Sequence, residues 1–162
     1  IGLQNSERYW KMETDGGFLT FNDVSAGGTV RMKLDTGGRT FVGTGGGSAQ
    51  FNVEKSTYIE QTALSSGTSV TWDADAAGNA YLSLGHNATI GKASNGNEGQ
   101  IIMIEIAQGG TAYTMAWNTI FEFAASTAPT VTATANKTDI FTFRYNGSVW
   151  QEIGRVQNMA QT

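Results

Sequence analysis

One hairpin near the C-terminal end of the 162-residue sequence constrains the fold more than any other feature. Residues Asp139 to Tyr145 alternate aromatic or apolar with polar side chains, at the two-residue period of a half-buried β-strand. Asn146-Gly147 follows, a dipeptide preferred in type I′ turns because both central residues there need a positive φ. Residues 149–156 then supply a returning strand, so the sequence predicts a β-hairpin over 139–156.

Short segments of the same kind recur along the chain between turn signals rich in Gly, Asn, Ser and Asp. Strands are expected at 8–14, 18–22, 29–34, 58–64, 69–73, 80–84, 88–91, 101–107 and 112–117. The single proline, Pro129, predicts a bend into a Thr-rich edge strand over 127–135. No segment keeps the 3.6-residue apolar period of a helix. The expected class is all-β, an antiparallel β-sandwich or jelly roll.

The sequence predicts two parts, a β-rich segment over residues 1–50 and a β-sandwich domain over 56–162. The strands of the first part are each too small to bury a core, which suggests a sheet completed by other chains. The glycine-rich run 43–48 is interpreted as a linker. A phosphate-binding loop would need a Lys-Ser/Thr pair at the start of a helix, and this run has neither.

The number and sign of the charged residues indicate which kinds of partner the chain can bind. Charged residues make up 15% of the chain, against roughly 25% in typical soluble domains. A monomer tolerates this composition, and it also fits a protomer that buries much of its flank against identical neighbours. The net charge is −4 and the ten basic residues are scattered, so no nucleic-acid partner is expected. The absence of cysteine excludes thiolate catalysis and Cys-ligated metals.

The most apolar run, residues 101–107, is interrupted by Glu105 and falls short of the ~20 residues that span a bilayer. Membrane insertion is therefore not expected. The chain starts at Ile1 without a signal-like segment, and we expect it to be a fragment or a processed product.

Three patterns in the sequence bear on catalysis or metal binding. His86, the single histidine, lies between Gly85 and Asn87 in what reads as a hairpin turn, so a solvated role is favoured over a catalytic base. Asp73 to Asn79 begins like a calcium loop, but later ligands are missing, and a turn closed by Asp73 and Asn79 fits better. No two carboxylates are paired by the sequence. The expectation is a protein that is not an enzyme and has no metal or cofactor.

Five residues are candidates for ligand contact. Tyr113, Trp117 and Asn118 could offer an aromatic face with nearby amides, which stacks on a sugar ring and bonds its hydroxyls. Asn95 and Asn97 belong to a polar loop that could contact the same ligand. The alternatives remain open: Trp117 can be a buried anchor at a strand end, and the loop can be an ordinary solvated turn.

An ordered set of motifs in the second part resembles a known family. The set comprises Trp117, the bend Ala128–Thr132, the strand Asp139–Phe143, the turn Tyr145–Gly147 and Trp150. Together they resemble the C-terminal β-sandwich module of tailed-bacteriophage tail fibres and related virion appendages. The resemblance covers roughly the last hundred of the 162 residues. Residues 1–50 look, more loosely, like the shaft segment that precedes this module.

The resemblance implies a location and an assembly. It implies a homotrimer with apolar side chains along its axis, located in the virion as the distal end of a tail fibre. The N-terminal side would attach to other virion tail proteins, and the knob would recognise the host surface, with glycan as the expected ligand. A purely structural trimerisation or fibre-decorating module is the alternative. A polysaccharide depolymerase ranks third, because such enzymes commonly use long parallel β-helix bodies.

Overall fold

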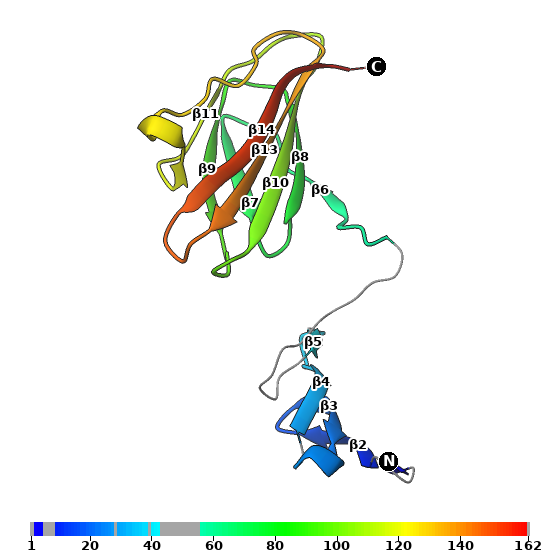
Figure 1. Cartoon of the computed structure of the whole chain (residues 1–162). Coiled ribbons are helices and arrows are strands. Elements are labelled where there is room, and N and C mark those ends of the chain that lie inside the picture. Colours follow the sequence, from blue (N-terminus) through cyan, green and yellow to red (C-terminus); the bar gives the residue numbers. More distant parts are fainter. Residues whose placement is uncertain (1, 5–8, 28, 39, 43–55, 162) are drawn as a thin grey trace. The chain divides into compact units, whose positions relative to one another are not determined.

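The computed structural model describes residues 2–4, 9–27, 29–38, 40–42 and 56–161. The chain divides into two compact units, Ile1–Thr57 and Tyr58–Thr162 (Figure 1). The predicted linker over 43–48 lies outside the described residues. The two units are described separately below.

The first unit contains a single antiparallel sheet whose five strands follow one another in sequence order. Its elements are β1 (Gly2–Gln4), β2 (Tyr9–Asp15), β3 (Phe18–Asp23), a 3-10 turn η1 (Val24–Ala26), β4 (Thr29–Leu34) and β5 (Thr40–Val42). The strands predicted over 8–14, 18–22 and 29–34 are confirmed as β2, β3 and β4. Gly16 and Gly17 join β2 to β3 with φ of 55° and 86°, left-handed values that a two-residue hairpin turn requires.

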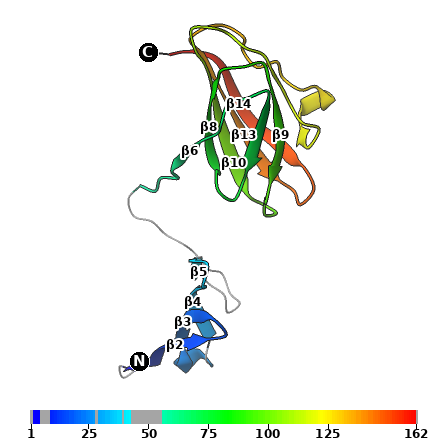
Figure 2. The same cartoon turned by 180° about the vertical axis from the view of Figure 1, so that it is seen from behind.

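The second unit contains two sheets packed around one apolar core (Figure 2). The larger has the order β12-β14-β13-β10-β8-β6 and the smaller β11-β9-β7. The strands are β6 (Gln61–Ala63), β7 (Ser69–Asp73), β8 (Asn79–Leu84), β9 (Ala88–Ser94), β10 (Ile101–Gln108), β11 (Met115–Ala116), β12 (Phe121–Glu122), β13 (Lys137–Tyr145) and β14 (Trp150–Ala160). The described residues contain no α-helix, and the predicted all-β class is confirmed.

The core lies where alternate residues of the two sheets face each other. In β7, Val70 and Trp72 are buried while Ser69 and Thr71 are exposed. The larger sheet contributes its inward residues at the same two-residue period: Leu82, Ile102, Ile104, Ile106, Phe141, Phe143 and Trp150, each at most 1% exposed. This alternation is what the sequence pattern predicted.

The prediction of an antiparallel sandwich is wrong for the strand pairing. Within the larger sheet, β10–β13 and β13–β14 are antiparallel, whereas β6–β8, β8–β10 and β12–β14 are parallel. Both pairs of the smaller sheet, β7–β9 and β9–β11, are parallel as well. The reason is topological: from β6 to β12 successive strands alternate between the sheets. Neighbours within a sheet are therefore two strands apart in sequence and run in the same direction.

This alternation also corrects the predicted turn around His86. Gly85, His86 and Asn87 connect β8 in the larger sheet to β9 in the smaller one, so they form a cross-sheet connection and not a hairpin. Gly85 donates its backbone N–H to Ser66 Oγ at 2.8 Å, which ties this connection to the one between β6 and β7. His86 is exposed there, as the sequence predicted.

The hairpin over 139–156 is confirmed as β13 and β14, but its turn is longer than predicted. Tyr145 pairs with Trp150, which leaves the four residues 146–149 in the loop. Asn146 Oδ1 accepts the backbone N–H groups of Ser148 and Val149 at 3.0 and 2.9 Å. Only Gly147 has a positive φ in this loop, 92°. The side chain of Asn146 thus closes an Asx turn in place of a type I′ turn.

The Thr-rich edge strand predicted over 127–135 is absent. This segment follows the 3-10 turn η2 (Ala124–Ser126) and has no strand pairing. Its backbone instead bonds to side chains: Thr132 N–H donates to Asp139 Oδ2 at 2.7 Å, and Gln157 Nε2 donates to the Thr130 carbonyl at 2.8 Å. Side-chain partners satisfy backbone groups that a strand ladder would otherwise satisfy.

Candidate functional site

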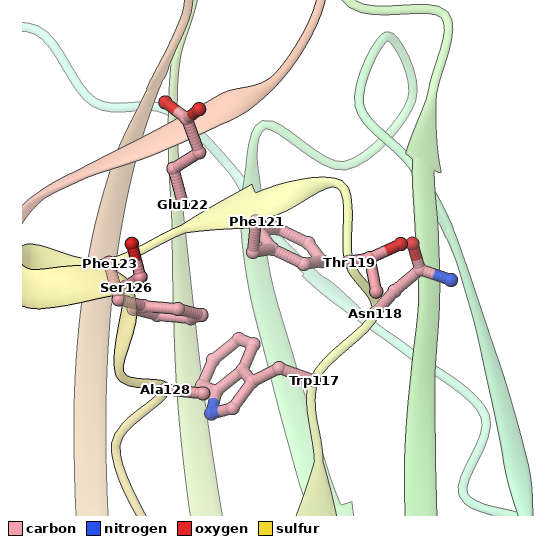
Figure 3. Close-up of a pocket in the computed structure, with 8 residues that line it drawn as sticks. All are labelled: Trp117, Asn118, Thr119, Phe121, Glu122, Phe123, Ser126 and Ala128. Atoms are coloured by element: carbon pink, nitrogen blue, oxygen red, sulfur yellow. The ribbon is translucent and has the colours of Figure 1, made fainter.

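A pocket of about 390 Å³, open to solvent, lies along the segment that leads from β11 through β12 to η2 (Figure 3). Its lining comes from one continuous piece of chain: Trp117, Asn118, Thr119, Phe121, Glu122, Phe123, Ser126 and Ala128. The three aromatic rings lie together, and Glu122 and Asn118 extend on opposite sides of them (Figure 3). The pocket therefore combines an apolar floor with a polar rim, the usual composition of a small-molecule site.

The floor is held by aromatic packing around Trp117. The Trp117 ring meets four phenylalanine rings edge to face, at centroid distances of 4.8–5.6 Å: Phe121, Phe123, Phe141 and Phe143. Its indole N–H donates to the Pro129 carbonyl at 3.0 Å. Trp117 is consequently half-buried and anchored to the core, and the part of its ring that stays accessible forms pocket surface.

The rim is polar, and two of its side chains are fixed by hydrogen bonds. Asn118 Oδ1 accepts the backbone N–H of Ile120 at 3.0 Å. This bond holds the amide oxygen of Asn118 against the backbone, so its NH₂ group points away from that backbone. Glu122 Oε2 accepts Gln151 Nε2 at 3.0 Å, across the short parallel pairing of β12 with β14. The Ser126 and Thr119 hydroxyls complete the rim. These groups offer both donors and acceptors to a polar ligand.

The backbone at one margin of the pocket is in an unusual conformation. Ala125 and Ser126, in the turn η2, have φ of 54° and 53°. Residues with a Cβ rarely adopt this left-handed region, and consecutive examples cost roughly 1 kcal/mol or more each. Such strain clusters at ligand sites, and here it sets the position of Ser126 at the rim.

The charge of the pocket is that of a single carboxylate. Glu122 is exposed, and it is the one ionisable side chain in the lining. A carboxylate and an amide suit the hydroxyl donors of a neutral ligand, whereas phosphate or carboxylate groups would need Lys or Arg.

The structure brings two of the five predicted contact residues into the pocket, Trp117 and Asn118. Tyr113 lies in the connection between β10 and β11, where its backbone N–H donates to the buried Gln108 Oε1 at 2.9 Å. Asn95 and Asn97 lie in the connection between β9 and β10, and neither lines the pocket.

Sequence reasoning missed Glu122, Phe123 and Ser126. Glu122 belongs to a two-residue strand, Ser126 to a 3-10 turn, and Phe123 lies between them; both elements are too short to carry a periodic signal. Their proximity to Trp117 and Asn118 along the chain is the signal that could have found them.

Asp73 and Asn79, the candidates for a calcium loop, make hydrogen bonds to the backbone. Asp73 Oδ1 accepts the backbone N–H of Asp75 at 3.1 Å, and Asn79 Nδ2 donates to the Ile59 carbonyl at 3.0 Å. The predicted turn is thus confirmed for Asp73, whereas Asn79 bonds to the backbone of Ile59, outside the turn. Within the part of the chain that the structure describes, no three His, Cys, Asp or Glu side chains gather as a metal site would require. Over the same residues, no helix has the length and apolarity needed to cross a bilayer.

Neither the scan against protein-family models nor the search of curated proteins finds a match for this chain.

Proposed function

We propose that the chain is the distal part of a bacteriophage tail fibre or similar virion appendage, and that its second unit binds a glycan of the host surface. The observation that carries the binding role is the pocket around Trp117, with its aromatic floor and polar rim. The virion location rests on the motifs Trp117, Ala128–Thr132, Asp139–Phe143, Tyr145–Gly147 and Trp150.

The pocket supports a sugar as ligand. Accessible aromatic surface of the half-buried Trp117 and Phe123 can pack against the C–H face of a pyranose ring. Around it, Glu122 accepts hydrogen bonds from sugar hydroxyls, and the Ser126 hydroxyl can donate or accept. A volume of about 390 Å³ accommodates one or two sugar rings, within the usual size range of ligand pockets.

The ligand we propose is a neutral saccharide. Glu122 repels phosphate and carboxylate groups, and the described lining contains no cation to offset it. A neutral O-antigen or capsular unit therefore fits better than a phosphorylated or uronic-acid polymer.

Binding without cleavage fits the lining better than glycoside hydrolysis. Hydrolysis by the usual mechanisms needs two carboxyl groups flanking the scissile bond. The pocket lining, all of it within the described residues, holds Glu122 and no second carboxyl group. The depolymerase is accordingly not favoured.

The assembly we propose is a homotrimer whose second units form jelly-roll-like knobs and whose N-terminal side joins other virion tail proteins. One shallow pocket per chain gives weak affinity. Three pockets engaged together on a host surface raise the overall binding by roughly 10² to 10⁴ without any new contact.

A purely structural module is the second candidate, and the packing of Trp117 favours it. The four ring contacts and the bond to Pro129 would be needed for stability even if no ligand existed. Separating the two candidates requires variants that change the rim and spare this packing.

The test measures saccharide binding by the full chain with the variant Glu122→Gln. This change removes the charge, while the new amide oxygen can still accept the bond from Gln151. We expect affinity for a neutral bacterial polysaccharide to fall about tenfold, because bonds to charged acceptors contribute roughly 1.5–3 kcal/mol.

The matched control is Glu60→Gln, the same chemical change at an exposed site of the second unit outside the pocket. It should leave affinity unchanged. Asn97→Ala tests the predicted loop contact separately. Equal affinity of Glu122→Gln and wild type for the saccharide would show that the ligand binds outside this pocket. The absence of any saccharide binding would favour the purely structural module.

A further inference from the structure

Glycine follows asparagine at two places in the second unit, Asn95-Gly96 and Asn146-Gly147. This dipeptide is able to modify itself, because the backbone nitrogen of the glycine can attack the side-chain carbonyl carbon of the asparagine. Glycine favours the attack, since it has no Cβ to hinder it and its backbone turns freely. The two dipeptides lie in different connections, β9–β10 and β13–β14, and the fold holds them in different conformations.

The reacting groups of Asn146-Gly147 are accessible and unbonded. Asn146, Gly147 and Ser148 are all exposed in the loop between β13 and β14. Among the described residues, the Gly147 N–H has no acceptor and the Asn146 Nδ2 group has no hydrogen-bond partner. A Cβ built at Gly147 would lie no closer than 3.7 Å to a neighbouring atom, in the Glu98 carboxylate. The attacking nitrogen and the leaving group therefore give up no bond to the protein.

The carbonyl that would be attacked is held and polarised by the backbone. Asn146 Oδ1 accepts the N–H groups of Ser148 and Val149 at 3.0 and 2.9 Å, so the side chain folds forward over the following residues. This oxygen gains negative charge during the attack, and paired backbone donors are what stabilises such a charge in acyl transfer. The Asx turn thus keeps the carbonyl close to the Gly147 nitrogen and favours the reaction.

Asn95-Gly96 has the same two residues, but the fold opposes the reaction there. Asn95 has a φ of 57°. In this left-handed region ψ is about +47°, which places the next backbone nitrogen opposite the Cβ of the asparagine. The Gly96 nitrogen therefore points away from the carbon that it would have to reach. Rotation is hindered, because Gly96 lies so close to the buried Trp150 that a Cβ would be 2.5 Å from Cζ2 of the ring.

We propose that Asn146 is a site of self-modification in the folded chain and that the fold protects Asn95. The Gly147 nitrogen loses its proton to a base in the solvent and forms a bond to Asn146 Cγ. The Cγ–Nδ2 bond breaks, and Nδ2 takes up a proton and leaves as ammonia. The product is a cyclic imide. Water then opens the ring: cleavage at Cγ gives aspartate, and cleavage at the main-chain carbonyl carbon gives isoaspartate.

Both products change the loop. Each adds one negative charge, close to the Glu98 carboxylate that lies beside Gly147. In the isoaspartate the former side-chain carbonyl becomes part of the main chain, so the Asx turn is lost and the N–H groups of Ser148 and Val149 lose their acceptor. The inference concerns this loop alone and rests neither on the proposed ligand nor on the proposed assembly.

The test compares the two dipeptides within the same molecule. The full chain is incubated in mildly alkaline buffer, once folded and once unfolded in guanidinium chloride, and mass spectrometry follows the peptide that contains each dipeptide. In the unfolded chain we expect comparable rates, because only the local sequence then acts. In the folded chain Asn146 should convert at least as fast as it does unfolded. Asn95 should convert more slowly by about tenfold or more, as a packing clash at Gly96 raises its barrier.

Two matched variants assign the change in mass. Asn146→Gln lengthens the side chain by one methylene, which disfavours ring closure, so the conversion of this peptide should disappear. Asn95→Gln is the control and should leave the conversion at Asn146 unchanged. Labelling by an isoaspartyl methyltransferase separates isoaspartate from aspartate. The comparison within the wild type stands even where a variant fails to fold.

The outcomes are distinct from those of the proposed function. An Asn146 that converts in guanidinium chloride but stays intact in the folded chain overturns the inference. Equal rates at Asn95 and Asn146 in the folded chain overturn it as well. Neither result alters the binding of saccharide or the mass of the assembly, which are measured on freshly purified, unmodified chain.

Discussion

Trp117 donates its indole N–H to the carbonyl of Pro129 at 3.0 Å. The bond joins two parts of the motif set that lie 12 residues apart in the sequence, on either side of β12 and η2. A third part is joined the same way, because the Thr132 N–H donates to Asp139 Oδ2 at 2.7 Å. The tryptophan, the proline bend and the acidic start of β13 thus form one connected structure, which closes the irregular segment over the core.

Replacing Trp117 tests how much of the second unit depends on this anchor. Trp117→Ala should lower the free energy of unfolding by about 3 kcal/mol, because a half-buried aromatic loses its ring contacts. Trp117→Phe keeps much of the packing but leaves the Pro129 carbonyl without its donor, at a cost of about 1–2 kcal/mol. Urea titration followed by fluorescence of the buried Trp72 and Trp150 measures both. Two equal losses would show that the hydrogen bond carries most of the effect.

Asp139 is fully buried and accepts three hydrogen bonds, from Thr132 N–H, Gln157 Nε2 and Asn158 N–H. In Asp139→Asn one oxygen becomes an NH₂ group that faces a donor. We expect the free energy of unfolding to fall by about 2–4 kcal/mol, the cost of leaving buried donors unsatisfied near a lost charged acceptor. The exposed Asp75→Asn is the control and should change stability by less than about 0.5 kcal/mol.

Gly96 is required by its neighbour Trp150. A Cβ at position 96 would lie 2.5 Å from Trp150 Cζ2. Trp150 is fully buried, and its indole N–H donates to the Ala93 carbonyl at 2.9 Å, so the ring cannot yield.

Gly96→Ala should therefore destabilise the second unit by about 1–3 kcal/mol, as overpacking usually does. A Cβ at Gly110 would meet no atom within 4 Å, so Gly110→Ala is the matched control. Thermal denaturation of the two variants compares them directly, and equal melting temperatures would contradict the packing.

Glu13 in the first unit gives a pH prediction. The hydrogen bond from Lys11 lowers the pKa of the Glu13 carboxyl below its ordinary value of 4.5, and the bond from Asn22 acts in the same direction. A depressed folded-state pKa means that the stabilisation is present above 4.5 and is lost as the pH falls through the folded value.

Carboxyl NMR titration should find the Glu13 midpoint below 4.5 in the wild type and nearer 4.5 in Lys11→Met. Lys92→Met removes an exposed cation from the second unit and should leave the midpoint unchanged. A midpoint that Lys11→Met does not raise would argue against this ion pair as the cause.

The sequence predicted where strands lie more successfully than how they pair. The two-residue alternation of β7, β8 and β10 follows from burial of one face, and it is the same whichever strand lies alongside. Gly85, His86 and Asn87 suit a hairpin turn and a cross-sheet connection equally well. The local residues therefore do not determine whether neighbouring strands run parallel or antiparallel. The packing of both sheets around one core determines it.

The pocket was predictable only in part, for a related reason. Trp117 and Asn118 stand out because an aromatic beside an amide is a recognisable binding pattern. Glu122 and Ser126 reach the same pocket through β12, which pairs with the distant β14, and through a left-handed turn at η2. Neither the pairing of β12 nor the turn at η2 produces a periodic pattern in the sequence. The segment 127–135 was misread as a strand because its partners are the side chains of Asp139 and Gln157.

The most direct test of the proposed function is the binding of the purified full chain to a panel of neutral and anionic bacterial surface polysaccharides. Biolayer interferometry would compare the wild type with Glu122→Gln and Glu60→Gln. We predict binding to at least one neutral polysaccharide, weakened about tenfold by Glu122→Gln and unchanged by Glu60→Gln. Binding confined to anionic polymers, or equal for all three proteins, would contradict a saccharide site at this pocket.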